Sequence, residues 1–393
     1  MMFKSLTKKI TAGITAAALG FSLTFSAPAV AEASGADVAV GIGAAILQAS
    51  LARNEVKKQI KVINDTEEGR EALYQKFREE YGVNTDYEFN ALLDRIMSNL
   101  TNAVGQVDSK IYEKPYKYFV SNQQEVNAAC SMGHVMMVNV GLLKSIYSED
   151  EIAAVVGHEM GHGQGDHVAK SINKNITKQM IAGVAVAAAG GNSLSNIAGQ
   201  FLFATSVAHG SRKFESEADN LAWEYMLHTN YNPGACAAMM QKLWELSKGA
   251  KGNFLSSHPD TDKRRDNYVK KLYEYSGKHV DAKDGVISIN GKTFTTVAAT
   301  SKMSSPERSY MVMGNLAKAY HNGKTYSAAT VSNGTIYLDD MAIMTPAEGD
   351  EDAYTLAERL NELINTPLPA KDKKSKDKKS DKKDKKSYSK KAT

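Results

Sequence analysis

Apolar residues recur with a helical period in several parts of the chain. After Thr85 they fall on one helix face, and Glu88 completes a capping-box pattern with Thr85. Ser148 and Glu151 repeat the pattern ahead of another helix. Helices are also predicted around residues 211–228 and 233–248 and near the C-terminal end. The apolar positions of the first and last helices are Phe89, Leu92, Leu93, Ile96 and Leu100, and Leu356, Leu360 and Leu363.

A second pattern predicts short strands. Tyr116–Val120 and Val135–Val140 are rich in β-forming residues, with Asn127, Ala128 and Gly133 between them. We expect them to form a small sheet, with Val135–Val140 at its edge. Further along, Asn-Gly turns at 290–291 and 333–334 predict hairpins over 286–296 and 325–338.

Four segments are apolar without a clear period. Residues 10–25 follow Lys4, Lys8 and Lys9 and precede Ala29-Val30-Ala31, which is typical of a secretory signal peptide over residues 1–31. A retained membrane anchor is the alternative. Residues 36–51 are rich in Ala and Gly and fit a packed helix. Residues 180–191 and 197–204 fit either core helices or a flap or membrane-contacting hairpin over a cleft, each being too short to span a bilayer.

Charge is distributed unevenly. Residues 371–393 carry +8 and residues 1–31 carry +3, so the whole-chain charge of +4 leaves −7 on residues 32–370. The body therefore lacks the basic stripe of a nucleic-acid-binding protein, and we expect no nucleic-acid partner. The Lys/Asp/Ser tail over residues 367–393 is predicted to be disordered. It is either plainly solvated or attached by charge to an anionic envelope surface.

The cysteines suggest no nucleophile. The chain has two, Cys130 and Cys236, which could form one disulfide after export or remain as buried thiols. Neither has a His beside it that would activate a thiolate.

The residues that carry chemistry lie on the helix after Ser148. His158, Glu159 and His162 form an HExxH motif, and positions i and i+4 of a helix lie one above the other. Both imidazoles can therefore bind one metal ion, with Glu159 beside it to accept a proton from water. We expect this ion to be Zn²⁺.

Two sequence rules compete for the third protein ligand. The rule HExxHxxGxxH fits Gly165 but ends on Val168, and His167 comes one residue early. A Glu on a later helix is the other rule, and Glu215 satisfies it. Asp219, four residues further, lies on the same helix face and can accept a hydrogen bond from a ligating His. We therefore predict Glu215 as the ligand and His167 as a neighbour outside the ligand set.

These residues resemble the HtpX and CAAX prenyl endopeptidase family of gluzincins, and especially its soluble exported branch. The matching stretches lie within residues 50–275. They are Asn127-Ala128 with Gly133–Leu143, Gly157–His162 with His167, Ser211–Asp219, and His258-Pro259 with Arg264. The resemblance implies an α+β fold: a mostly helical zincin-type metallopeptidase core with a small sheet whose edge strand flanks the active-site helix. It also implies that His258 stabilises the oxyanion or caps the zinc at rest, with a buried structural His as the alternative, and that Arg212, like Asp219, lies just behind the metal ligands.

The sequence thus predicts a zinc metalloendopeptidase domain over residues 32–280 and a small mixed module over residues 281–366. Zinc would polarise the scissile carbonyl, and Glu159 would move the proton. Substrates would be unfolded or extended polypeptides, paired as a strand with Val135–Val140. Export and the resemblance suggest misfolded or misassembled envelope and outer-membrane proteins in the periplasm, or outside the cell. The alternatives are a chaperone-like protein with a latent, gated site and a structural zinc protein.

Overall fold

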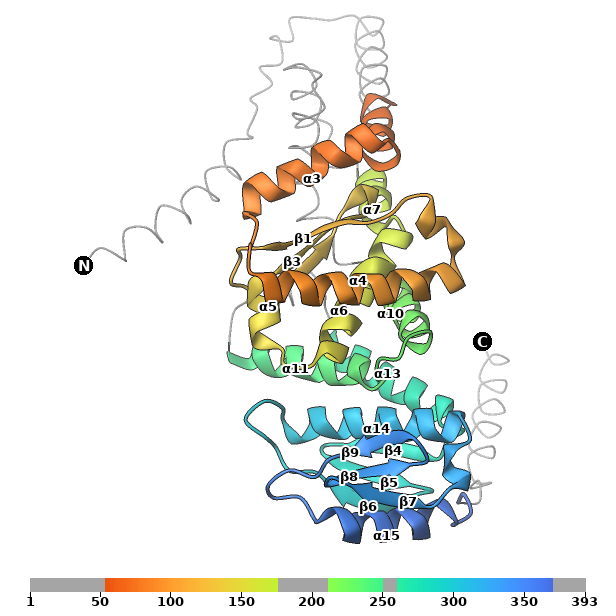
Figure 1. Cartoon of the computed structure of the whole chain (residues 1–393). Helices are drawn as coiled ribbons and strands as arrows, with labels where there is room; N and C mark the ends of the chain where they lie inside the picture. The colour runs from red at the N-terminus through yellow and green to blue at the C-terminus, as the bar shows by residue number, and fades with distance from the viewer. Residues whose placement is uncertain (1–53, 176–210, 250–259, 370–393) are drawn as a thin grey trace, which may run out of the picture. The chain divides into compact units, whose positions relative to one another are not determined.

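The computed structural model describes residues 54–175, 211–249 and 260–369 (Figure 1). Helices dominate, and three three-stranded sheets accompany them, which confirms the predicted α+β class. Among the described residues, no helix is both long and apolar enough to cross a membrane. The predicted signal peptide, the apolar segments at 36–51 and 180–204, His258, and residues 370–393 of the Lys-rich tail lie outside the described residues.

The elements follow in chain order after a helix over residues 54–65. They are α3 (Glu67–Tyr81), α4 (Tyr87–Val107), η1 (Ser109–Tyr112), β1 (Lys117–Ser121), β2 (Ala128–Cys130), η2 (Met132–His134), β3 (Val135–Asn139), α5 (Val140–Ser145), α6 (Glu149–Gln164), α7 (His167–Asn175), α10 (Arg212–Leu227), α11 (Ala235–Gly249), α13 (Thr261–Tyr275), β4 (Val280–Lys283), β5 (Val286–Ile289), β6 (Lys292–Thr296), α14 (Ser305–His321), η4 (Lys324–Tyr326), β7 (Ala329–Ser332), β8 (Thr335–Leu338), β9 (Met341–Met344) and α15 (Ala353–Ile364). Within the described residues, the predicted helices and hairpins are all present. Asp86, rather than Thr85, caps α4 by accepting hydrogen bonds from the backbone N–H groups of Glu88 (2.9 Å) and Phe89 (3.3 Å).

The described residues form two compact units. One holds residues 54–90, 110–140, 159–175 and 211–218, and the other holds residues 91–109, 141–158, 219–249 and 260–369. In the first unit, one apolar core joins the helix over residues 54–65, α3, the sheet and α7. Its members include Ile60, Ile63, Phe77, Val135 and Ile172.

The sheet of the first unit corrects one prediction. Its strand order is β1-β3-β2, with β1 parallel and β2 antiparallel to β3. The segment Val135–Val140 is therefore not an edge strand, because β3 is paired on both sides. The strand β2 forms an edge of the sheet instead. It has three residues, Ala, Ala and Cys, and is too short and too weakly patterned to be recognised from sequence.

The second unit includes a module made of two β-meanders. The strands β4-β5-β6 form one antiparallel sheet and β7-β8-β9 form the other, so each predicted hairpin gains a third strand. Both sheets lie between α14 and α15 (Figure 1). Helix α14 packs against β4, β5 and β9, whereas α15 packs against β7, β8 and β6. The third strand of each meander thus lies under the helix that follows the other meander.

The two meanders repeat each other at a distance of 49 residues. Left-handed turns occur at Asp284-Gly285 and again at Asn333-Gly334. A β-bulge follows Ile287 in the first meander and Ile336 in the second. The buried positions also correspond: Ile287, Ile289 and Phe294 match Ile336, Leu338 and Ile343. The repeated turns, bulges and core positions make the two meanders an internal structural repeat.

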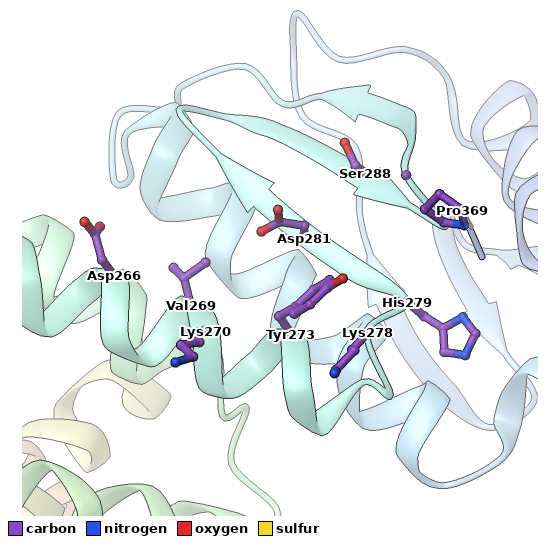
Figure 2. A pocket seen from close by; sticks show the side chains of 10 residues that line it. Asp266, Val269, Lys270, Tyr273, Lys278, His279, Asp281, Ser288 and Pro369 are labelled. Atoms are coloured by element: carbon purple, nitrogen blue, oxygen red, sulfur yellow. The ribbon is translucent and has the colours of Figure 1, made fainter. Parts of the chain in front are cut away.

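A groove lies beside the first meander. It has a volume of about 510 Å³ and is bounded by α13 and by the strands β4 and β5 (Figure 2). Tyr273 and Lys270 line it from α13, and Asp281 and Ser288 line it from the strands. Side chains of both charge signs line this groove, so it favours no single class of ligand.

A buried acidic pair lies at the start of α6. Glu151 and Glu307 are both almost completely buried and share a hydrogen bond. Lys242 donates to both oxygens of Glu307, at 3.0 and 3.2 Å. Burial first, and then the charge of Glu307, raises the pKa of Glu151 to about 9. Glu151 is therefore a neutral acid near pH 7, and its side chain connects α6 to α14 through the hydrogen bond with Glu307.

This pair makes stability depend on pH. Between about pH 5 and pH 9 the unfolded chain loses the Glu151 proton while the folded protein keeps it, so the free energy of unfolding falls as the pH rises. Glu151→Gln mimics the neutral acid and cannot titrate. We expect the variant to be more stable than the parent at about pH 8, by a margin that shrinks toward about pH 5.

Urea denaturation at the two pH values measures this difference. Glu358→Gln, at an exposed position of α15, is the matched control and should show no such margin. A Glu151→Gln variant that is less stable than the parent at about pH 8 would mean that this carboxyl is ionised in the folded protein.

Candidate metal centre

Three predicted metal-ligating side chains meet at one point. His158 and His162 lie on α6, and Glu215 lies on the first turn of α10. One ligand atom from each lies within 4.8 Å of the others, and all three residues are buried. Two imidazoles and one carboxylate are a donor set that suits Zn²⁺, and three protein ligands leave a position for water.

A glycine allows the two helices to come close. A Cβ atom on Gly161 would lie 2.8 Å from the carbonyl oxygen of Ala218 and 3.0 Å from its Cα. Any larger residue at position 161 would therefore push α10 away from α6. The approach at Gly161 is what places Glu215, three residues before Ala218, within 3.4 Å of His162 Nε2.

Asp219 lies behind His158, and several groups hold it there. His158 Nδ1 is 3.0 Å from Asp219 Oδ1. Arg264 donates from Nε to Oδ2 (2.8 Å) and from Nη2 to Oδ1 (2.7 Å), and the Tyr268 hydroxyl donates to Oδ1 (3.0 Å). Burial opposes ionisation of Asp219. The charge of Arg264 and the hydrogen bonds from His158 and Arg264 outweigh it and hold the pKa well below its usual range.

His167 supports the second histidine and is not part of the cluster of three. Its Nδ1 lies 2.9 Å from His162 Nδ1. The ring stacks on Phe214 with 4.3 Å between centroids, and its Nε2 is 3.6 Å from a carboxylate oxygen of Glu217. Gly165 makes room for the ring, because a Cβ there would lie 2.3 Å from His167 Nε2.

Glu159 is fully buried beside the cluster, and the edge strand holds it. The backbone N–H of Cys130 donates to Glu159 Oε2 at 2.9 Å. Tyr116 donates from its hydroxyl to the carbonyl oxygen of Met160 (2.8 Å), which ties α6 to the segment just before β1. The strand that flanks the helix is therefore β2, and it contacts the proposed base directly.

The other residues that the sequence singled out do not belong to the cluster of described residues around His158. Arg212 is the first residue of α10 and is exposed, and His258 lies outside the described residues. Cys130 and Cys236 are free, buried thiols, so the disulfide alternative does not hold. Burial raises the pKa of both thiols, which makes them poor nucleophiles.

Sequence reasoning assigned no role to Arg264 or Tyr268. Both come from α13, more than forty residues beyond Asp219, and local spacing cannot reveal such a contact. The only sequence signal was the position of Arg264 shortly after His258-Pro259. The Cys130 N–H was also missed, because a backbone donor leaves no mark in the residue type.

Comparison with known proteins points to one family. Residues 90–270 match the model of Peptidase family M48. The mitochondrial metalloendopeptidase OMA1 of Arabidopsis thaliana is 32% identical over 149 residues, which cover 38% of this chain and 30% of that protein. The metalloprotease LoiP of Escherichia coli (strain K12) is 28% identical over 175 residues, which cover 43% of this chain and 66% of LoiP.

A further relative is the beta-barrel assembly-enhancing protease of Yersinia pestis. It is 22% identical over 189 residues, which cover 44% of this chain and 38% of that protein. The chain therefore spans less than two thirds of each of these relatives. The matched segment includes all the clustered residues from His158 to Arg264, and this chain therefore contains a Peptidase family M48 domain, over residues 90–270.

Proposed function

We propose that this protein is a zinc-dependent endopeptidase in which His158, His162 and Glu215 bind the metal and Glu159 is the general base. The buried cluster of these two imidazoles and one carboxylate, with Glu159 next to His158 on the same helix, carries the proposal. A structural zinc site would have four protein ligands and would not need a buried Glu beside the first His. The family match supports the same activity.

The surrounding residues fix the protonation and orientation of the ligands. An Asp219 carboxylate accepts the Nδ1–H of His158, which leaves Nε2 for the metal. His167 accepts from Nδ1–H of His162 in the same way, so that Nε2 of His162 faces Glu215. A bound zinc ion would polarise the carbonyl and activate water. Glu159, held by the Cys130 N–H, would take the proton from that water and return it to the leaving amine.

The substrate would pair with the edge of β2 that faces away from β3; Ala128 and Cys130 are buried there, so the groups that cover this edge would have to give way to the peptide. The carbonyl of Asn127 and the N–H of Ser131 point toward β3, since they bond Asn139 (3.0 Å) and Val135 (2.7 Å). Backbone groups alternate along a strand, so Ala128 and Cys130 direct theirs away from β3. The Cys130 N–H on that side already binds Glu159. An extended peptide paired with Ala128 would therefore pass next to the base, with recognition mainly through its backbone.

Unfolded or misassembled polypeptides are the proposed substrates. Pairing with a strand edge requires an extended segment, which a compact folded protein does not offer. The name of the Yersinia relative refers to β-barrel assembly, which supports outer-membrane or other envelope proteins as substrates. The signal-peptide pattern of residues 1–31 supports the periplasm as the location.

Glu159→Gln tests the proposed chemistry. The amide keeps the size of the side chain and cannot accept a proton, so we expect casein cleavage to fall by about 10²–10⁴-fold with zinc content unchanged. Digestion assays and metal analysis of the purified protein measure the two effects. The control is Glu224→Gln, an exposed position of the same helix α10 that takes no part in the cluster.

Two outcomes would contradict the proposal. If the parent and Glu159→Gln cleave casein equally and EDTA does not inhibit either protein, the protein is not a metal-dependent peptidase that uses Glu159. If neither protein cleaves but both suppress aggregation of an unfolded protein, the chaperone-like alternative with a gated site is correct.

Ala128→Pro tests the substrate edge. Proline removes the N–H that faces away from β3; because Ala128 is buried, circular dichroism must first show that the variant folds. We expect kcat/KM for an unfolded protein to fall by about tenfold and zinc affinity to stay unchanged. Ala128→Gly keeps the N–H and is the control. Equal losses in the two variants would mean that the side chain, rather than strand pairing, matters.

Arg264→Gln tests the support of the first ligand. Without the guanidinium, Asp219 loses its paired charge and holds His158 less firmly, so zinc affinity should fall by about 10–100-fold. Competition with a chromophoric chelator measures it. Arg265→Gln is the control, because Arg265 bonds Gln241 and Asp266 instead. Unchanged zinc affinity in Arg264→Gln would show that Asp219 does not need this partner.

A further inference from the structure

A second groove lies in the first unit, away from the histidine cluster. It is formed by the helix over residues 54–65 and by α7, which contribute Ile60 and Ala169 to the apolar core of that unit and also line the groove. Its volume is about 680 Å³. Neither the proposed catalysis nor the family match assigns it a role.

Lysines dominate the lining of this groove. Lys57 and Lys61 come from one helix, and Lys170 and Lys174 come from the other. Each pair is spaced i, i+4, so its two ammonium groups lie on one face of their helix. All four residues are exposed. This concentration of positive charge contrasts with residues 32–370 as a whole, whose net charge is −7.

The groove also contains two acidic residues, Asp65 and Asp166, and other groups already bind them. Asn64 Nδ2 donates to both carboxylates, at 2.8 and 3.1 Å. Lys114, which is not a lining residue, approaches Asp166 at 3.6 Å and Asp65 at 4.0 Å. The lining therefore carries a positive excess, with four lysines against two aspartates.

The sequence next to the two helices favours lipid phosphates as the anions that bind in this groove. The lysine-bearing helix that starts at residue 54 follows the apolar run 36–51, and α7 ends at Asn175, shortly before the apolar run 180–191. In a sequence, lysines that adjoin apolar runs are typical of proteins at a membrane surface, where the ammonium groups contact lipid phosphates.

The residue types also argue against nucleic acid. Single-stranded nucleic acids bind to grooves in which aromatic side chains stack on the bases, and none of the residues that line this groove is aromatic. Lysines act as point charges that bind phosphates without demanding a planar arrangement. Lysines can therefore bind the phosphates of lipid headgroups, whose arrangement at a membrane surface is not fixed.

We propose that the groove of Lys57, Lys61, Lys170 and Lys174 is a docking surface for the anionic headgroups of a phospholipid membrane. This inference goes beyond the proposed peptidase activity and does not depend on it.

Binding of the full-length exported chain to vesicles tests the proposal. Flotation or co-sedimentation would compare vesicles of phosphatidylglycerol and phosphatidylethanolamine with vesicles of phosphatidylcholine alone. We expect binding to the anionic vesicles that weakens as NaCl is raised. The variant Lys57→Glu/Lys61→Glu/Lys170→Glu/Lys174→Glu should bind these vesicles at least about tenfold more weakly, since each lysine near the surface contributes to the attraction.

The matched control carries the same change of charge elsewhere. Lys270→Glu/Lys278→Glu/Lys283→Glu/Lys292→Glu alters four exposed lysines of α13 and the first meander and should bind like the parent. Both variants retain the Lys-rich tail. The milder set Lys→Gln at the four groove positions, checked by circular dichroism, replaces the first variant if it fails to fold. Equal binding by groove and control variants, or no binding of the parent to anionic vesicles, would overturn the proposal.

Discussion

The close approach of α6 to α10 at Gly161 is the constraint on which the rest of the site depends. A Cβ there would lie 2.8 Å from the carbonyl oxygen of Ala218. His158 pairs with Asp219 and His162 pairs with Glu215, so the sequence order along one helix is reversed on the other. The two helices therefore run in opposite directions. Each has an i, i+4 pair facing the other helix, and one glycine contact aligns both pairs.

Bringing these groups together in a buried site has an electrostatic cost. A carboxylate such as Asp219 is disfavoured away from water unless positive charge and hydrogen-bond donors surround it. Arg264, Tyr268 and His158 supply them. Because Asp219 is held ionised by partners other than the metal, the acceptor for His158 Nδ1–H exists before any ion binds. A preformed acceptor of this kind reduces the reorganisation that metal binding would require.

Sequence periodicity predicted what lies within single helices and could not predict what lies between distant segments. The i, i+4 spacing was enough to place His158 near His162 and Glu215 near Asp219, because helix geometry alone fixes those distances. The edge strand was misassigned because β2 consists of Ala, Ala and Cys, whereas β3 has the β-branched and apolar run that marks a strand. Arg264 was missed for a related reason, since only the tertiary fold brings α13 to Asp219.

Helix α13 also links the two-meander module to the residues around Asp219, which belong to the same compact unit. Near its beginning, Arg264 and Tyr268 bind Asp219. At its end, the ring of Tyr275 stacks on His321 of α14, with 4.0 Å between centroids. One helix therefore contacts both the carboxylate beside His158 and the module, and α13 is the element that joins the two.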